Sequence, residues 1–529
     1  MVGYNGMSAG ESVVNHPDYL ILGTGLSALS FGALMAKSGK RVKLIEAHEY
    51  PGGYGHTFPQ GEKYRFNAQL HYVWNCGKGQ PVYQILEKLG LHEDVTFERY
   101  KANGYDRMRI PGFELDIPYD YDLLGDRLAA LFPEANDDIR RFLKTIQSIG
   151  EGISRFEKIN SPVQLAKHAG PMWSLVKYHR ATLQQVFDAF NLPLEAQSLL
   201  ASQWPDFLLP PNQLSIIAWA ALFTGYARGA YYPTNHYEHV VQSLERAILE
   251  NGGEVLYQNR VVEFMVDGDT VRGVMTEDLS GSGAHDEHLG ESVVCNIDPQ
   301  RAAEMIGMEK FAKRTRKRLD YDYSPSSFMA YCVVDGLDLS ALGFGRSNLF
   351  HSCDVDLNRT FHTMYTLGDY SKPSFAMTTP SLHTIERGEC PDGQQIIEFL
   401  TVANYQRFLD LRISSRRDYN KKKDEILETI IDLAEEHYIP GLRDHMVFKI
   451  TGSPTTSERY CAAPRGNSYG SNLTPRNLGL FRLNHRTSLR NFHFCNASSG
   501  HPGFAGTFAT GARLYEKLTG DSVYKGSIG

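Results

Sequence analysis

Several polar side chains lie inside apolar or glycine-rich segments, where they could carry chemistry. His71 lies in FNAQLHYVWNCG (66–77), and His501 lies in SGHPGF. A neutral imidazole can donate a proton or hold a polar edge of a ligand near pH 7. We predict that His71 and His501 are catalytic groups; the alternative is that each is a satisfied polar side chain of the fold. What binds beside them decides between the two.

Two further polar residues, Arg465 and Tyr469, lie in the segment GSPTTSERYCAAPRGNSYG. A guanidinium and a phenol can both donate hydrogen bonds to a substrate hydroxyl or carboxylate. We predict substrate contacts for both, and a structural ion pair is the alternative for Arg465.

The elements that must position these groups begin with DYLILGTGLSALSFGALMAKSGKRVKLIEA (18–47). An apolar run is followed by a glycine turn, a helix and a second strand that ends on an acid, which is the order of a dinucleotide-binding unit. Glycines permit the turn and the approach of a pyrophosphate, and the free N–H groups of the helix N-terminus face the phosphate. The acid accepts hydrogen bonds from an adenosine ribose. The predicted contacts are Gly23, Gly25, Leu26, Ser27, Ala28, Glu46 and Ala47.

A glycine pair follows the second strand. EAHEYPGGYGHTF places Gly52 and Gly53 soon after the acid, and His56 and Thr57 come next. This order resembles the extended flavin fingerprint of the amine oxidase and phytoene desaturase superfamily. The resemblance implies FAD as the cofactor, with these four residues beside it.

Other segments narrow the resemblance to the carotenoid isomerase and retinol saturase branch. FNAQLHYVW after HTF, and AAPRG followed by YG, are similar to that branch, while ESVVCNIDP (291–299) and the hairpin around Asp267-Gly268 resemble the wider superfamily. The resemblance implies that the backbone of Val261 lies beside the adenine. It also implies that the segment of His71 returns to the flavin.

The last expected segment, NFHFCNASSGHPGFAGTFATGARLYEKLTG, departs from the relatives. In them a Gly-Asp pair ends the strand, and its Asp binds the ribityl chain. Alignment on Pro502-Gly503 puts Ser498 at that position, so a hydroxyl replaces a charge. We expect Ser498, Pro502, Gly503 and Phe504 to contact the flavin, and Ser498→Asp to tighten its binding.

A second departure lies in YYPTNHYEHVV, where the relatives carry Gly-Gly after YP. Here Thr234 and Asn235 occupy those positions. His236 is then a new polar group near the flavin, and we predict that it contacts the substrate.

The predicted fold class is α/β, with a Rossmann-type FAD-binding domain interwoven with a substrate-binding domain of α+β character. The cofactor motifs place the FAD domain in 18–77, 231–299 and 452–529, after a lead-in over 1–17. The substrate domain then takes 78–230 and 300–451. The first of these is helical in pattern; the second carries the expected strands SSFMAYCVV, HTMYTL and QQIIEFLTVA and the helix KKKDEILETIIDLAEEHY. LSGSGAHDEHLGE (279–291) is expected to be a polar loop.

Bulk composition limits the partners. The chain has 529 residues, 42% hydrophobic content and a net charge of −7 with no basic tract, which disfavours nucleic acid. Seven scattered cysteines without a CxxC pair indicate reduced thiols in a cytoplasmic protein and no metal site. The N-terminus lacks the features of a secretory signal. The apolar stretch 214–227 is too short to span a bilayer and indicates a buried helix or the wall of an apolar cavity.

Three functions follow from this pattern. The first is an FAD-dependent oxidoreductase that saturates or desaturates a C–C bond of an apolar polyene or isoprenoid substrate. The second is a redox-neutral polyene isomerase that uses reduced FAD. The third is a flavin-free lipid-binding protein, since Rab GDP-dissociation inhibitors resemble the same superfamily. No second dinucleotide unit occurs, so electrons come from NAD(P)H docked directly against the flavin or from another donor. Peripheral membrane contact is expected for an apolar substrate.

Overall fold

The first of the two large sheets is five-stranded and parallel. The computed structural model describes residues 16–156, 173–384 and 388–525. The strand order is β10-β2-β1-β14-β20. These strands are β1 (Tyr19–Leu22), β2 (Val42–Ile45), β10 (Glu254–Leu256), β14 (Ser292–Cys295) and β20 (Phe492–Phe494). Short apolar runs such as YLIL suit a parallel sheet because both of its faces are covered. The predicted α/β fold class with a Rossmann-type sheet is therefore confirmed.

Helix α1 (Leu26–Lys37) is buried along almost its whole length. It packs against α19 (Phe504–Thr519) and α11 (His236–Glu250). The crossing with α19 is close: a Cβ on Gly511 would lie 2.4 Å from the carbonyl oxygen of Ser27. Helix α2 (Pro81–Leu89) contacts both α1 and α19. Together these helices pack around α1.

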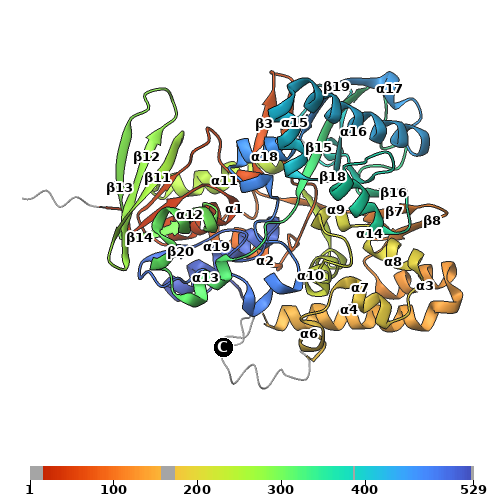
Figure 1. Cartoon of the computed structure of the whole chain (residues 1–529), viewed down its shortest axis with the longest axis horizontal. Coiled ribbons are helices and arrows are strands. Elements are labelled where there is room, and N and C mark those ends of the chain that lie inside the picture. The colour runs from red at the N-terminus through yellow and green to blue at the C-terminus, as the bar shows by residue number, and fades with distance from the viewer. Residues whose placement is uncertain (1–15, 157–172, 385–387, 526–529) are drawn as a thin grey trace, which may run out of the picture.

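A three-stranded antiparallel sheet extends beyond the parallel sheet, at the left of Figure 1. It contains β11 (Asn259–Asp267), β12 (Thr270–Asp278) and β13 (His285–Leu289). The hairpin predicted at Asp267-Gly268 is present. The expected polar loop over 279–291 is partly wrong, because β13 pairs with β12 there. Helix α12 (Pro299–Ile306) contacts β11.

The second large sheet is seven-stranded and mixed, with the order β19-β15-β18-β17-β16-β7-β8. Only β16 and β7 pair in parallel. Its strands are β7 (Asp106–Ile110), β8 (Phe113–Ile117), β15 (Ser326–Asp335), β16 (Asn348–Ser352), β17 (Ser374–Thr378), β18 (Gln394–Ala403) and β19 (Met446–Gly452). Central strands β15 and β18 are buried over most of their length, as the expected strands SSFMAYCVV and QQIIEFLTVA require.

The strand expected over HTMYTL is wrong. These residues, His362–Leu367, continue α14 (Leu357–Phe361) as a π-helical turn. The side chain of Asp356 caps α14 by accepting a hydrogen bond from the Arg359 N–H, and Met364 is fully buried. Capping and tertiary packing thus override the local strand propensity of the segment.

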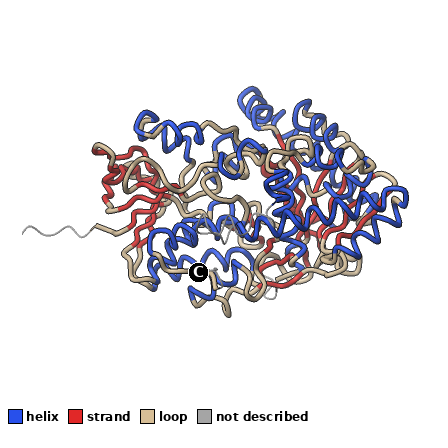
Figure 2. The backbone as a smooth tube through the Cα atoms, turned by 90° about the horizontal axis from the view of Figure 1, so that it is seen from below, coloured by secondary structure: helices blue, strands red, loops and turns tan. Residues whose placement is uncertain are grey.

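Helices cover the second sheet on both of its sides (Figures 1 and 2). Between β8 and β9 lie α3 (Tyr121–Leu131), α4 (Asn136–Phe156), α6 (Trp173–Tyr178), α7 (Leu183–Ala189), α8 (Leu194–Ala201), α9 (Trp204–Phe207) and α10 (Ile216–Ala227). Later in the chain come α13 (Lys313–Leu319), α15 (Tyr405–Ser414), α16 (Arg416–His437), α17 (Leu442–His445) and α18 (Pro454–Cys461). The apolar stretch 214–227 forms α10, which packs against α4.

The described chain also forms two small sheets. β3 (Thr57–Gln60) pairs with β4 (Tyr64–Asn67), and β9 (Ala230–Pro233) lies between β5 (Val73–Trp74) and β6 (Phe97–Arg99). The strands of the five-stranded sheet lie in the ranges predicted for the FAD domain, and those of the seven-stranded sheet lie almost entirely in the ranges predicted for the substrate domain. The domain boundaries themselves stay a prediction. In the described part of the chain, no helix has the length and apolar character needed to cross a bilayer.

Candidate functional site

The two glycine-rich segments meet at the end of β1. The Gly52 N–H donates to the Thr24 carbonyl at 3.0 Å, so the second segment runs beside the first turn. A Cβ on Gly53 would lie 3.4 Å from the Cα of Gly25, and no side chain stands between the two backbones. Gly52 has φ 112°, a conformation that favours glycine. The structure thus brings together two segments that are about thirty residues apart in the sequence. We call the surface formed by Gly25, Gly52 and Gly53 the cradle; its floor is backbone without side chains.

The N-terminus of α1 opens onto this cradle. Gly25 is the N-cap, no side chain caps the helix, and its first turn holds no acid. The N–H groups of Leu26 and Ser27, at the first helical positions, are therefore oriented to bind an anion. Ala28 is fully buried where α1 packs on its neighbours. A diphosphate fits this arrangement of bare glycines and helix amides.

Asn296, just after β14, holds the turn between β1 and α1 in place through hydrogen bonds. Its Oδ1 accepts from the Gly25 N–H at 3.0 Å, and its Nδ2 donates to the Ser27 Oγ at 2.9 Å. Ser27 Oγ in turn donates to the Cys495 carbonyl at 2.9 Å. Three segments from distant parts of the sequence are held together here. Sequence reasoning included Asn296 in a family-like segment but did not identify it as a site residue.

Glu46, at the end of β2, points back to the same turn. Its carboxylate accepts from Thr24 N–H at 2.8 Å, from Thr24 Oγ at 2.6 Å and from His48 N–H at 2.8 Å. The Asn259 N–H donates to the Glu46 carbonyl at 2.9 Å, so the start of β11 lies beside the acid. Val261, two residues along β11, and Ala47 are both half-buried at this end of the site.

His56, Thr57 and His236 form a buried group next to the glycine pair. His56 Nδ1 lies 2.5 Å from the Gly53 carbonyl oxygen, and Thr57 Oγ1 lies 3.4 Å from His236 Nδ1. Burial lowers the pKa of His56 and lowers that of His236 to about 4. Both imidazoles are therefore neutral at pH 7. His236 begins α11 with φ 64°, a strained value for a residue with a Cβ.

The loop after β20 lies against the 452–470 segment. Ser498 is buried, its Oγ accepts from the Ser471 N–H at 3.0 Å, and a Cβ on Gly470 would be 2.1 Å from that oxygen. The hydroxyl of Ser498 is thus engaged by protein backbone. Arg482, which sequence reasoning missed, is buried beneath the loop and donates to the carbonyls of Ala497 and Gly500.

The residues at the end of this loop that were predicted to contact the flavin lie in different environments. Gly503 has φ 76° and begins α19, and Pro502 is half-buried. Phe504 is buried, with its ring 5.7 Å from that of Tyr237. His501 is exposed on the surface. The structure therefore separates the two histidines predicted to be catalytic, one inside and one outside.

His71 is the interior one. Its Nδ1 lies 3.6 Å from a carboxylate oxygen of Glu398, and neither ring nitrogen has a hydrogen-bond partner among the described residues. Glu398 is fully buried on β18, and burial raises its pKa, an effect that His71 partly offsets. Sequence reasoning missed Glu398, although an acid inside the apolar strand QQIIEFLTVA was a detectable signal.

Arg465 and Tyr469 occupy different environments. Arg465 is exposed, has φ 57°, and its backbone N–H donates to Glu458 at 3.3 Å. Tyr469 donates its hydroxyl to the backbone carbonyl of Asp206 in α9. The tyrosine thus joins the 452–470 segment to the interior, while the arginine lies outside it.

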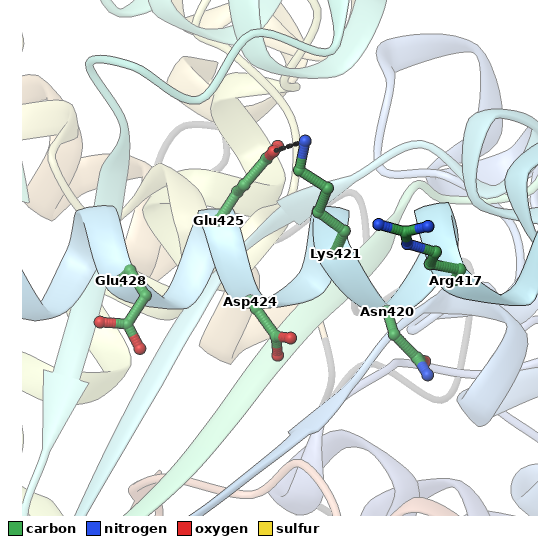
Figure 3. A pocket seen from close by; sticks show the side chains of 6 residues that line it. All are labelled: Arg417, Asn420, Lys421, Asp424, Glu425 and Glu428. Carbon is green, nitrogen blue, oxygen red and sulfur yellow. Dashed lines mark ion pairs between the residues drawn. The ribbon is translucent and has the colours of Figure 1, made fainter.

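A surface hollow on α16 lies apart from these residues (Figure 3). All its lining side chains come from that helix, and Lys421 and Glu425 form an ion pair at 3.6 Å. Exposed charges along one helix face are typical of a solvated surface. We assign no site to it.

Comparisons with known proteins agree with this geometry. The family model described as an NAD(P)-binding Rossmann-like domain matches residues 21–89. The chain is 21% identical over 498 residues to all-trans-retinol 13,14-reductase of Danio rerio, covering 86% of this chain and 77% of that one. It is 22% identical to prolycopene isomerase 2 of an Oncidium hybrid cultivar, covering 92% and 80%. Cyclohexylamine oxidase of Brevibacterium oxydans has the same fold at a TM-score of 0.60, with 15% identity and coverage of 95% and 99%.

The fold and the cradle define a Rossmann-type protein with a site for a flavin or another nucleotide cofactor. More narrowly, the chain is similar to a retinol 13,14-reductase and to prolycopene isomerases, so the resemblance to the phytoene desaturase, carotenoid isomerase and retinol saturase-like oxidoreductases that the sequence predicted is confirmed. Its relatives are enzymes, which favours the enzyme over the lipid-binding alternative.

Proposed function

We propose that the protein is an FAD-dependent oxidoreductase that saturates or desaturates a C–C bond of an apolar polyene or isoprenoid substrate. The observation that carries the proposal is the convergence of Gly25, Gly52 and Gly53 at the open N-terminus of α1. In the interior, both ring nitrogens of His71 are buried without hydrogen-bond partners among the described residues. A cofactor held at the cradle and a reactive interior are what this class of reaction requires.

The chain's own residues would hold and orient the cofactor. FAD, when bound, supplies a centre that accepts or donates a hydride. Leu26 and Ser27 would bind its diphosphate through their N–H groups, and Glu46 would accept hydrogen bonds from the adenosine ribose. Ser498 remains our prediction for the ribityl region, with a neutral acceptor where relatives carry an acid.

The substrate class is supported by the interior around His71 and by the names of the relatives. Tyr100, Tyr232 and His383 form a stack, with ring centroids 4.6 and 4.9 Å apart on the two sides of His383. The hydroxyls of Tyr100 and Tyr237 are buried without partners among the described residues. Aromatic side chains with a few polar groups among them suit contact with an apolar substrate that carries one polar end. The relatives act on retinol and prolycopene, two polyenes, according to their names.

Redox-neutral isomerisation of a polyene is the second candidate. It is favoured by the prolycopene isomerase relatives, which cover more of this chain than the retinol 13,14-reductase of Danio rerio does. The same cradle serves both reactions, since reduced FAD would be required for isomerisation.

Purified protein separates these functions. We expect the absorbance spectrum of bound flavin, and a released cofactor with the mass of FAD. Incubation with a retinoid or carotenoid, with and without NADPH, is followed by mass spectrometry of the product. A change of two hydrogens supports saturation or desaturation, and an unchanged mass with altered retention supports isomerisation. A protein without flavin, or one that leaves every polyene unchanged, contradicts the proposal.

Peripheral membrane contact is a further part of the proposal. Helix α6 buries none of its residues, and Trp173 and Val176 are 66% and 53% exposed. Lys177 and Arg180 are close by in sequence, and apolar groups flanked by cations suit an anionic lipid surface. Flotation with liposomes tests this. Wild type should float with vesicles that contain phosphatidylserine, and Trp173→Ser should float less.

A further inference from the structure

Two buried carboxyl groups share one tyrosine hydroxyl beside His71. Tyr72 Oη lies 2.9 Å from an Asp106 oxygen and 3.2 Å from an Asp206 oxygen. Asp106 lies on β7, and Asp206 lies on α9. The ring of Tyr72 is stacked on that of Tyr226, with centroids 4.1 Å apart and an angle of 1°. The hydroxyl position between the two acids is therefore held by packing.

Tyr72, Asp106 and Asp206, which we call the triad, can form both hydrogen bonds only if one of the two acids also carries a proton. A tyrosine hydroxyl has one hydrogen and can donate to only one of the two acids. The other contact is a hydrogen bond only if that acid carries a proton and donates it to Tyr72 Oη. With both acids ionised, two buried charges would face one hydroxyl, which is costly.

The surroundings assign the proton to Asp206. Asp106 also accepts from Gln203 Nε2 and, at 3.4 Å, from Asn348 Nδ2, and such donors stabilise the ionised form. Asp206 receives no side-chain donor besides Tyr72 in the described residues. Burial and the nearby Asp106 raise its pKa well above the usual range. Burial also raises the pKa of Asp106, to about 7.

Further unpartnered groups lie at the same place. Gln203 Oε1 and the hydroxyls of Tyr100 and Tyr105 are buried without hydrogen-bond partners in the described chain. The titratable groups that face the pair are tyrosines, namely Tyr72, Tyr100, Tyr105, Tyr226 and Tyr469. Burial raises the pKa of each, so they stay neutral at pH 7. Unpaired acceptors and donors beside a stored proton indicate a site built for a ligand.

We propose that Asp206 is the proton donor of the reaction, and that Tyr72 and Asp106 are positioning residues that hold its proton in place. The residue Asp206 is 9% exposed while Asp106 is fully buried, so Asp206 is the more accessible of the two acids. This inference rests on the proposed function, which needs a proton for one of the two carbons.

The step balances as follows. Adding hydrogen across a C=C bond puts a hydride with its electron pair on one carbon and a proton on the other. FAD in its reduced form, held by the residues of the cradle, would supply the hydride. Asp206 breaks its O–H bond to give the proton and becomes a carboxylate, which regains a proton from water.

Infrared spectroscopy tests the stored proton without any turnover. At pH 9, above the pKa of Asp106 of about 7, wild type should still show the carbonyl stretch of a protonated carboxylic acid, and Asp206→Asn should lack it. Glu398→Gln is the matched control, because Glu398 is the other buried acid near His71. A wild type without the band, or a band lost only in Glu398→Gln, overturns the assignment.

Product formation tests the donor role. In Asp206→Asn the rate should fall by about 10²–10⁴, the usual contribution of a general acid, with unchanged flavin content. Glu425→Gln, in the surface hollow on α16 to which no site is assigned, should keep the wild-type rate. An undiminished rate in Asp206→Asn refutes the donor role.

A second variant covers the case in which Asp206→Asn does not fold. Tyr72→Phe keeps the ring stack but removes the shared hydroxyl, so the midpoint of the pH–rate profile should move. An unchanged midpoint contradicts the proposal. If wild type converts no polyene, the proposed function fails, whereas the infrared result still decides whether the triad holds a proton.

Discussion

Replacing Gly25 by alanine should separate the stability of the cradle from its capacity to bind a cofactor. Gly25 has φ −60° and ψ 160°, which alanine adopts without strain, so any cost must come from contacts. A Cβ there would lie 2.5 Å from Asn296 Oδ1. Asn296 must move, and its hydrogen bonds to Gly25 N–H and Ser27 Oγ are then weakened or lost.

The magnitude follows from these bonds. Each buried hydrogen bond contributes about 1 kcal/mol, and a buried donor left unpaired costs about 1–3 kcal/mol. We therefore expect Gly25→Ala to lower the free energy of unfolding by about 2–4 kcal/mol. Asn296→Ala removes all three atoms that crowd the new methyl group. The double variant should be more stable than the sum of the single effects predicts, by about 1–2 kcal/mol.

The assay combines denaturant unfolding of the four proteins with titration of their flavin-free forms by FAD. Relief of the clash should make the double variant more stable than additivity predicts, but it should not restore affinity, because the methyl group still occupies the floor of the cradle. Strictly additive unfolding energies would refute the steric argument. Wild-type affinity in Gly25→Ala would refute the position assigned to the diphosphate.

Three further outcomes follow from the site. Ser498→Asp should lower the free energy of unfolding by about 1–3 kcal/mol in thermal unfolding, because Ser471 N–H and Gly470 surround the Ser498 hydroxyl and leave no room for a larger side chain. Contrary to the expectation from sequence, the variant should not bind FAD more tightly. Tighter binding in a stable variant would contradict this. The buried pair gives a pH dependence: the folded protein keeps the proton of Asp106 up to about pH 7, while the unfolded chain loses it near pH 4, so this contribution to stability declines as the pH rises through that window. Denaturant unfolding should show that the fall from pH 4 to pH 7 is smaller in Asp106→Asn by up to about 4 kcal/mol, at about 1.4 kcal/mol per pKa unit, and equal slopes would contradict it. Glu398→Gln should keep bound flavin but change the pH–rate profile measured from pH 5 to pH 9, since it removes the acid that faces His71; an identical profile would leave His71 without a role in proton transfer.

The sequence alone was sufficient to predict the nucleotide-binding half of the fold. Its rules are local: an apolar run, glycines at fixed spacing, a helix and a terminal acid lie within one short segment, so the physical reason for each residue is contained in its neighbours. The hairpin at Asp267-Gly268 and the helix over KKKDEILETIIDLAEEHY (421–438), most of which lies in α16, were predictable for the same reason. Motif order along the chain was enough to indicate the superfamily.

The tertiary structure decided which polar residues face the interior. Asn296 reaches Gly25 across 271 residues, and Asp206 reaches Tyr72 across 134, and no local pattern encodes either pairing. The same holds for the histidines, because motif position gave His71 and His501 equal standing and only packing buried one of them. Whether an acid is a solvated surface group or a stored proton depends on its desolvation and on the donors around it, and both are set by elements distant in the chain.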